Sequence, residues 1–121
     1  DKSKLMSTIL RLILSCAAIG ISAWITPGVS LPELSSSGGV VTLLVVALVL
    51  ALLNTFIKPI IKLLALPVTV LTLGLFVFVI NALIIMLCSW FVDGFIVEGF
   101  ASALVFSMIL SVVSWLLNKV F

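Results

Sequence analysis

Apolar stretches of membrane-spanning length alternate with short polar breaks along the chain. Crossing a bilayer as a helix takes about 20 consecutive apolar residues. Four stretches approach or exceed this length, and they predict helices at about residues 5–25, 40–57, 67–92 and 100–118. The breaks contain Pro-Gly, Ser-Gly and Asp-Gly sequences, which favour turns. The pattern therefore predicts an all-α, polytopic membrane protein, in which residues 1–121 form a single domain of four transmembrane helices.

The connection between the second and third predicted helices has an unusual composition. Residues 63–92 contain no charged side chain. An unbroken helix of about 30 residues would rise about 45 Å, well beyond the roughly 30 Å hydrocarbon core. Pro67 offers a natural break, so residues 58–66 are predicted to form a short interfacial segment. Lys58 and Lys62 would then face the lipid headgroups, whereas the alternative is a tight turn whose lysines only set the topology.

Composition and charge predict the environment and the orientation of these helices. Hydrophobic residues make up 64% of the chain and charged residues only 8%, whereas a soluble domain carries about 25% charged residues. A soluble protein and a basic nucleic-acid-binding protein are therefore excluded. Every basic residue falls on one side of the predicted helices, and three of the four acidic residues fall on the other. Because Lys and Arg mark the cytoplasmic side, we predict a multi-pass protein of the bacterial inner (plasma) membrane with both termini in the cytoplasm.

The chain lacks the residues that most chemistry requires. It contains no histidine, and the deep parts of its apolar stretches contain no Asp, Glu, Lys or Arg. It has no glycine-rich phosphate loop, nucleophile-and-base pair or metal-ligand cluster. We therefore predict no enzyme, no cofactor and no metal site, and the composition also disfavours a proton-coupled transporter or channel subunit. No small-x-small cleavage site follows the first apolar stretch, so we expect it to remain as a helix rather than be removed as a signal peptide.

Polar residues inside the predicted helices are candidate site residues. Asn54 lies near the inner end of the second helix, and Asn81 lies near the middle of the third. Asn81 either lines a polar path, fixes an oligomer, or bonds a neighbouring helix of the same subunit. Arg11 is close enough to the inner end of the first helix for its side chain to reach the headgroups.

The fourth predicted helix has one face of small residues. These residues are Gly99, Ala103, Ser107 and Ser111, spaced by four positions. Small side chains let helix backbones approach closely. The face therefore predicts helix packing, either against the third helix of the same subunit or between subunits.

Short sequence motifs occur around the second and third helices and in the last break. They are NTFIKPI (54–60), LP (66–67), LTLGLF (71–76), VINA (79–82), GFIV (94–97) and GF (99–100). Together they resemble the mycobacterial-type four-transmembrane phage holin family, holin superfamily IV, over the chain from Leu12 to Ser114. The motif residues that carry the resemblance are Asn54, Lys58, Pro59, Pro67, Thr72, Gly74, Phe76, Asn81, Gly94 and Gly99.

The resemblance implies a protein that gathers in the inner membrane and opens lesions through which a lytic enzyme reaches the cell wall. We therefore expect a holin-like protein that self-assembles into a homo-oligomer and permeabilises the membrane. Four short helices enclose too little volume for a wide path through one subunit. The alternative is a structural or envelope-stress membrane protein that organises lipids or partner proteins without pore activity. Both roles make the lipid bilayer a partner, and the second would use Lys58 and Lys62 on the cytoplasmic face.

Overall fold

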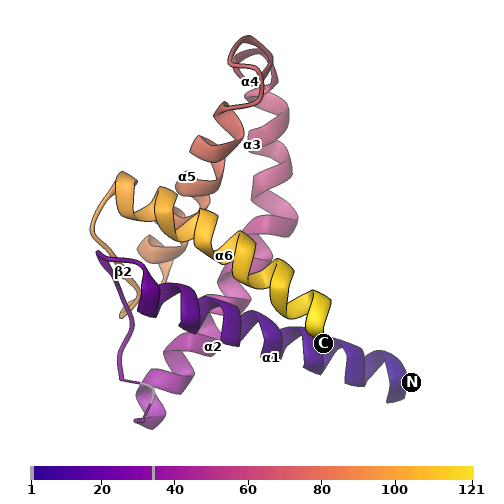
Figure 1. Ribbon diagram of the computed structural model, residues 1–121, viewed down its shortest axis with the longest axis vertical. Coiled ribbons are helices and arrows are strands. Elements are labelled where there is room, and N and C mark those ends of the chain that lie inside the picture. The colour runs from indigo at the N-terminus through magenta and orange to yellow at the C-terminus, as the bar shows by residue number, and fades with distance from the viewer. Residues whose placement is uncertain (1, 34) are drawn as a thin grey trace.

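Four helical passes meet at one end of the molecule and diverge towards the other. The structure, a computed structural model, describes residues 2–33 and 35–121. Its elements are α1 (Lys2–Ile25), β1 (Val29–Ser30), α2 (Ser37–Leu52), the π-helical turn η1 (Leu53–Ile57), α3 (Lys58–Leu64), α4 (Leu66–Leu71), α5 (Phe76–Phe91), β2 (Ile96–Val97) and α6 (Phe100–Val120). In Figure 1, α1 and α6 lie side by side and antiparallel, and the long helix formed by α2 and α3 crosses them. The α5 helix returns beside α3 and also packs against α6.

Two short strands join the passes at the end where they meet. Strands β1 and β2 pair antiparallel, with Val29 opposite Val97 and Ser30 opposite Ile96. The backbone N–H of Glu98 donates to the carbonyl of Gly28 at 2.8 Å, which extends this pairing. We call the two paired strands the clasp. It ties the connection after α1 to the connection before α6, so the two loops that the charge pattern places on one side are in contact.

The buried core occupies the half of the molecule nearest the clasp. Phe95, which follows α5, stacks on Phe106 of α6 with ring centroids 5.6 Å apart, and both side chains are buried. The thiol of Cys88 lies 3.7 Å from the carbonyl oxygen of Val46 and links α5 to α2. Farther from the clasp the helices pack less closely. Helices α3 and α4 have no buried residue, and the last buried residue of α6 is Ser107. The helices are therefore closely packed at one end only.

The residues of the expected interfacial segment, 58–66, form α3, its end and the first residue of α4, and α3 continues directly from the preceding helix. The helix begun by α2 continues through η1 and α3 to Leu64, and its 28 residues make it the longest apolar helix described. Pro59 cannot donate a hydrogen bond, and its ring would collide with the carbonyl four residues earlier in a regular α-helix. The wider π-helical turn accommodates it, with the N–H of Lys58 bonded to the carbonyl of Leu53. A proline thus modifies this helix without ending it.

The expected third helix at residues 67–92 is divided in two. Helix α4 ends in a Schellman motif, in which the Gly74 N–H bonds the Thr69 carbonyl at 2.8 Å. Leu73 takes the left-handed position of this motif with φ 57°, and its side chain is 93% exposed. The hydroxyl of Thr72 then accepts from the N–H of Phe76 at 3.1 Å and starts α5. The LTLGLF motif therefore encodes a turn between two helices.

Helix lengths are consistent with a membrane protein, with one pass shorter than the others. Helices Lys2–Ile25, Ser37–Leu64 and Phe100–Val120 are long and apolar enough to cross a membrane. The apolar helix α5 has 16 residues, which rise about 24 Å. The 28-residue helix rises about 42 Å, which exceeds a core of about 30 Å, so the helix either tilts or extends into the headgroup layer.

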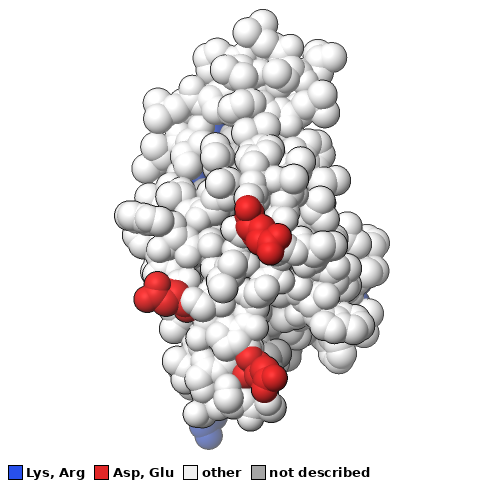
Figure 2. Space-filling model, turned by 90° about the vertical axis from the view of Figure 1, so that its left-hand side faces the viewer, with Lys and Arg blue, Asp and Glu red and all other residues white. Residues whose placement is uncertain are grey.

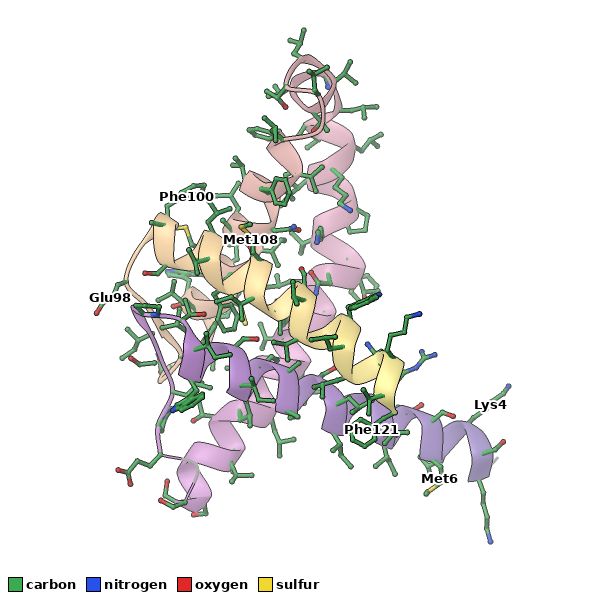
Figure 3. The ribbon with its side chains drawn as sticks, viewed as in Figure 1. Lys4, Met6, Glu98, Phe100, Met108 and Phe121 are labelled. Carbon is green, nitrogen blue, oxygen red and sulfur yellow. The ribbon has the colours of Figure 1, made fainter. Side chains whose placement is uncertain are left out.

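Charge is segregated between the two ends of the molecule. Figure 2 looks onto the side that carries the clasp, where red acidic side chains are exposed and blue basic ones show only at margins and through gaps. The acidic residues that the structure describes are Glu33, Asp93 and Glu98, and all three lie in connections at this end. Figure 3 shows Glu98 at this end and Lys4 at the opposite one, near Phe121. We call these the acidic end and the basic end.

Candidate functional site: a polar cleft at the basic end

Three adjoining hollows lie where the helices diverge, and we call them together the cleft. The inner hollow, about 80 Å³, is lined by Leu50, Asn54, Lys58, Asn81, Ile84, Ile85, Ser107, Leu110 and Ser111. The middle hollow, about 140 Å³, is lined by Ser15, Ile19, Ala47, Leu50, Ala51, Asn54, Leu110 and Ser114. The entrance hollow, about 440 Å³, is lined by Arg11, Leu14, Ser15, Ser114, Leu117 and Asn118. Each hollow shares lining residues with the next, so polar side chains from α1, η1, α3, α5 and α6 face one region.

The π-helical turn and α3 place two of the motif residues in the inner hollow. Asn54 lies within η1, and Lys58 follows four residues later, which is about one helical turn. Both line the inner hollow, whereas Lys62 is exposed on α3 and does not. The two lysines that the sequence suggested as a lipid-facing pair therefore differ in their surroundings. Only Lys58 belongs to the cleft.

Asn81 brings an unpaired polar atom into the same hollow from α5. Its side-chain oxygen Oδ1 is buried and accepts no hydrogen bond from the described residues. Leaving a buried acceptor unsatisfied costs about 1–3 kcal/mol. Of the open interpretations of Asn81, the placement agrees with a residue that lines a polar space, because no bond to a neighbouring helix satisfies this oxygen. The oxygen therefore lacks a hydrogen-bond donor among the described residues, beside a hollow that its own residue lines.

The small-residue face of α6 divides between the core and the cleft. Ala103 and Ser107 are buried, with Ser107 only 5% exposed, and α6 packs closely against α5. Ser111 is exposed and lines the inner hollow. The hydroxyl of Ser107 donates to the Leu104 carbonyl at 2.8 Å, and that of Ser111 donates to the Ser107 carbonyl at 2.9 Å. Their hydroxyl protons are thus engaged within α6, and their oxygens remain acceptors.

The other motif residues shape the backbone away from the cleft. Thr72, Gly74 and Phe76 form the turn between α4 and α5. Gly94 has φ 94° and lies so near Pro32 that a Cβ there would come within 3.2 Å of its ring. Pro67 stands in the first turn of α4, Pro59 follows η1, and Gly99 precedes α6. The motif therefore combines residues that line the cleft with residues that set the turns.

No sequence motif marks the entrance of the cleft. Arg11 and Ser15 are one helical turn apart on α1, and Ser114 and Asn118 are one turn apart on α6. Such pairs mark short polar stripes on otherwise apolar helices. Their spacing could have revealed each stripe, but only the antiparallel packing of α1 on α6 brings them together.

Comparisons with known proteins identify the family. The family model described as the mycobacterial 4 TMS phage holin, superfamily IV, matches residues 6–116. The chain belongs to this holin family. The match includes the cleft residues from Arg11 to Ser114, and it agrees with the resemblance carried by the sequence motifs. The holin-family chain is thus a membrane protein with several apolar helices.

Two bacterial relatives resemble this holin-family chain over most of its length. "Uncharacterized protein SCO3922" of Streptomyces coelicolor is 40% identical over 114 residues, which cover 91% of each chain. "Uncharacterized membrane protein YvlD" of Bacillus subtilis is 42% identical over 88 residues, which cover 72% of this chain and 71% of that one. No solved structure matches the chain. The name of the Bacillus relative describes a membrane protein, and neither name specifies an activity.

Proposed function

We propose that this holin-family protein binds lipid in its cleft and so organises the bilayer around it. We also propose that a single subunit forms no pore. The observation that carries the proposal is a cleft that is lined by polar side chains at the basic end and ends at a packed core near the clasp. Its walls also include leucine and isoleucine side chains. A cavity with both kinds of lining suits an amphipathic molecule.

The outward faces of the helices give further support. Thr8, Thr42 and Thr55 each donate their hydroxyl to a carbonyl of their own helix, at 2.8–2.9 Å. Large apolar side chains are exposed around them along every pass. A water-filled pore between subunits needs a continuous polar face on the outside of each subunit. The side-chain amides of Asn54 and Asn81 instead line the cleft within one subunit. This distribution favours lipid binding over a lumen between subunits.

Reconstituted liposomes test the proposal. Liposomes that carry a self-quenching dye should retain it at every protein density, because the core closes the cleft at the acidic end. Ser111→Leu, which puts a larger apolar side chain into the inner hollow, serves as the matched variant and should retain the dye equally. Dye release that rises with the density of the wild-type protein and disappears in Ser111→Leu would contradict the proposal.

Holin-like permeabilisation is the second candidate, and the family match favours it. Here the subunits would form a homo-oligomer whose clefts face a common lumen. Its test is induced expression with continuous measurement of the membrane potential and of the release of a co-expressed wall hydrolase. Collapse of the potential with release of the hydrolase would support this candidate. A steady potential at high expression would exclude it.

The proposed location is the inner membrane of a bacterium, with the basic end and both termini in the cytoplasm. The segregation of Lys and Arg from Asp and Glu supports this orientation, and the relatives are bacterial proteins. Lipid would then enter the cleft from the cytoplasmic leaflet. Lys62, exposed on α3, is the candidate contact for membrane-protein partners.

A further inference from the structure

We propose that the cleft selects an anionic phospholipid with a hydroxylated headgroup, phosphatidylglycerol being the probe that fits it. Arg11 and Lys58 would bind the phosphate, and Asn81 would accept a hydrogen bond from a headgroup hydroxyl. This inference rests on the proposed lipid-binding role and names the chemistry that the cleft recognises.

Two cations line the hollows on either side of the middle hollow. Ser15 of α1 and Asn54 of η1 both line this hollow. Arg11 precedes Ser15 by four residues on α1, and Lys58 follows Asn54 by four, so each cation lies about one turn from a lining residue on the same helix face. Arg11 lines the entrance hollow and Lys58 lines the inner hollow. A phosphate in the cleft would therefore meet Lys58 on the inner side, with Arg11 adding positive charge at the entrance.

No described carboxylate lies in the cleft to neutralise these cations. Glu33, Asp93 and Glu98 belong to the connections at the acidic end, and no acidic residue lines any of the three hollows. Positive charge held at a membrane interface attracts anionic lipid. The quaternary ammonium group of a phosphatidylcholine would instead meet two like charges. The cleft therefore favours a headgroup with net negative charge.

The neutral polar groups of the inner hollow favour a headgroup that carries a hydroxyl. The unpaired oxygen of Asn81 needs a hydrogen-bond donor, which a phosphate diester does not have. The hydroxyl protons of Ser107 and Ser111 are bonded within α6, so these oxygens also act as acceptors. The hollow of about 80 Å³ has room for a few small polar groups, since one water needs only about 10–15 Å³ on this measure. A glycerol headgroup supplies such donors.

Lipid binding to the purified protein, measured by native mass spectrometry, tests the inference. Phosphatidylglycerol should bind more tightly than phosphatidylcholine with the same acyl chains. Lys58→Gln and Arg11→Gln should each weaken phosphatidylglycerol binding roughly fivefold, as expected for loss of one cation near an anionic lipid. Lys62→Gln, which removes the same charge from the same helix outside the cleft, should leave binding unchanged.

A second comparison isolates the headgroup hydroxyl. Asn81→Leu should weaken binding of phosphatidylglycerol and leave binding of phosphatidylmethanol, an anionic phosphodiester with no headgroup hydroxyl, as in the wild type. Circular dichroism and elution volume establish that each variant is folded. Equal weakening of both lipids would overturn the role of Asn81. If Lys62→Gln and Lys58→Gln weakened phosphatidylglycerol binding equally, the proposed site would be overturned, because any surface charge would then be enough to bind the lipid.

The failures of this inference and of the proposed function are distinguishable. Equal binding of phosphatidylglycerol and phosphatidylcholine that is lost in Ser111→Leu would overturn headgroup selection and leave lipid binding in the cleft. Binding of free glycerol phosphate as tightly as of phosphatidylglycerol would overturn lipid as the source of the phosphate. Absence of any retained lipid would overturn both proposals.

Discussion

Gly28→Ala should lower the free energy of unfolding by about 2–4 kcal/mol, because it strains the backbone and overfills the clasp. Gly28 has φ 85°, a left-handed conformation that costs an L-residue about 1–2 kcal/mol. A Cβ there would also overlap the hydroxyl of Ser102 and lie 3.2 Å from a carboxylate oxygen of Glu98. The measurement is reversible unfolding in mixed micelles.

Two variants make the Gly28 result specific. Gly99→Ala is the matched control, since Gly99 has an extended backbone and a Cβ there would meet nothing within 4 Å. It should unfold like the wild type. Ser102→Gly added to Gly28→Ala should recover the steric part of the loss and leave the backbone part. If Gly28→Ala unfolded at the wild-type midpoint, the clasp would not hold the loops as described.

Ser107→Leu should destabilise the folded subunit, whereas Ser111→Leu should fold as the wild type does and lose lipid. Ser107 is 5% exposed, α6 packs closely on α5, and the hollow beside Ser107 is only about 80 Å³, so a leucine there would press against packed side chains. Overpacking of this kind costs about 1–3 kcal/mol, and more at a rigid contact. Ser111 is exposed in the inner hollow, where leucine fills space that the lipid would take. Helicity, elution volume and retained lipid measure the two effects.

The same pair of variants distinguishes packing within the subunit from packing between subunits. A subunit interface along this face would make both variants fold and would weaken assembly in both. Monodisperse, helical Ser107→Leu protein with fewer subunits per particle than wild type would therefore contradict the internal packing of Ser107. Loss of folded protein in Ser107→Leu alone would support it.

The apolar helices and the segregation of charge could be predicted from sequence, because apolar stretches and basic residues act locally. The end of α1 at Ile25 and the start of α6 at Phe100 also followed from local signals, whereas the boundaries around Pro59 and Pro67 did not. Pro59 and Pro67 carry similar local signals, yet the helix continues past Pro59 through a π-helical turn and breaks just before Pro67. Leu73 takes a left-handed conformation that leucine does not favour, so only the following glycine gave a local sign of the turn.

The cleft could be predicted only in parts. Asn54, Lys58 and Asn81 were recognisable as polar residues in apolar surroundings and as members of a motif. Whether they face one another depends on how α5 packs on α2 and α6, which no local pattern specifies. The contribution of Arg11 depends likewise on the pairing of α1 with α6. Periodicity reveals polar stripes, and the tertiary fold decides which stripes share a cavity.

Accessibility of a single cysteine at position 81 tests most directly the central claim, a cleft open only at the basic end. Asn81→Cys would be placed in a background of Cys16→Ala and Cys88→Ala, with Ser3→Cys and Ile96→Cys as references for the two faces. A small charged thiol reagent would be applied to right-side-out and to inverted membrane vesicles. We predict that position 81 reacts only from the face that labels position 3, which should be the cytoplasmic one. Reaction from the face that labels position 96, or from neither face, would contradict the account.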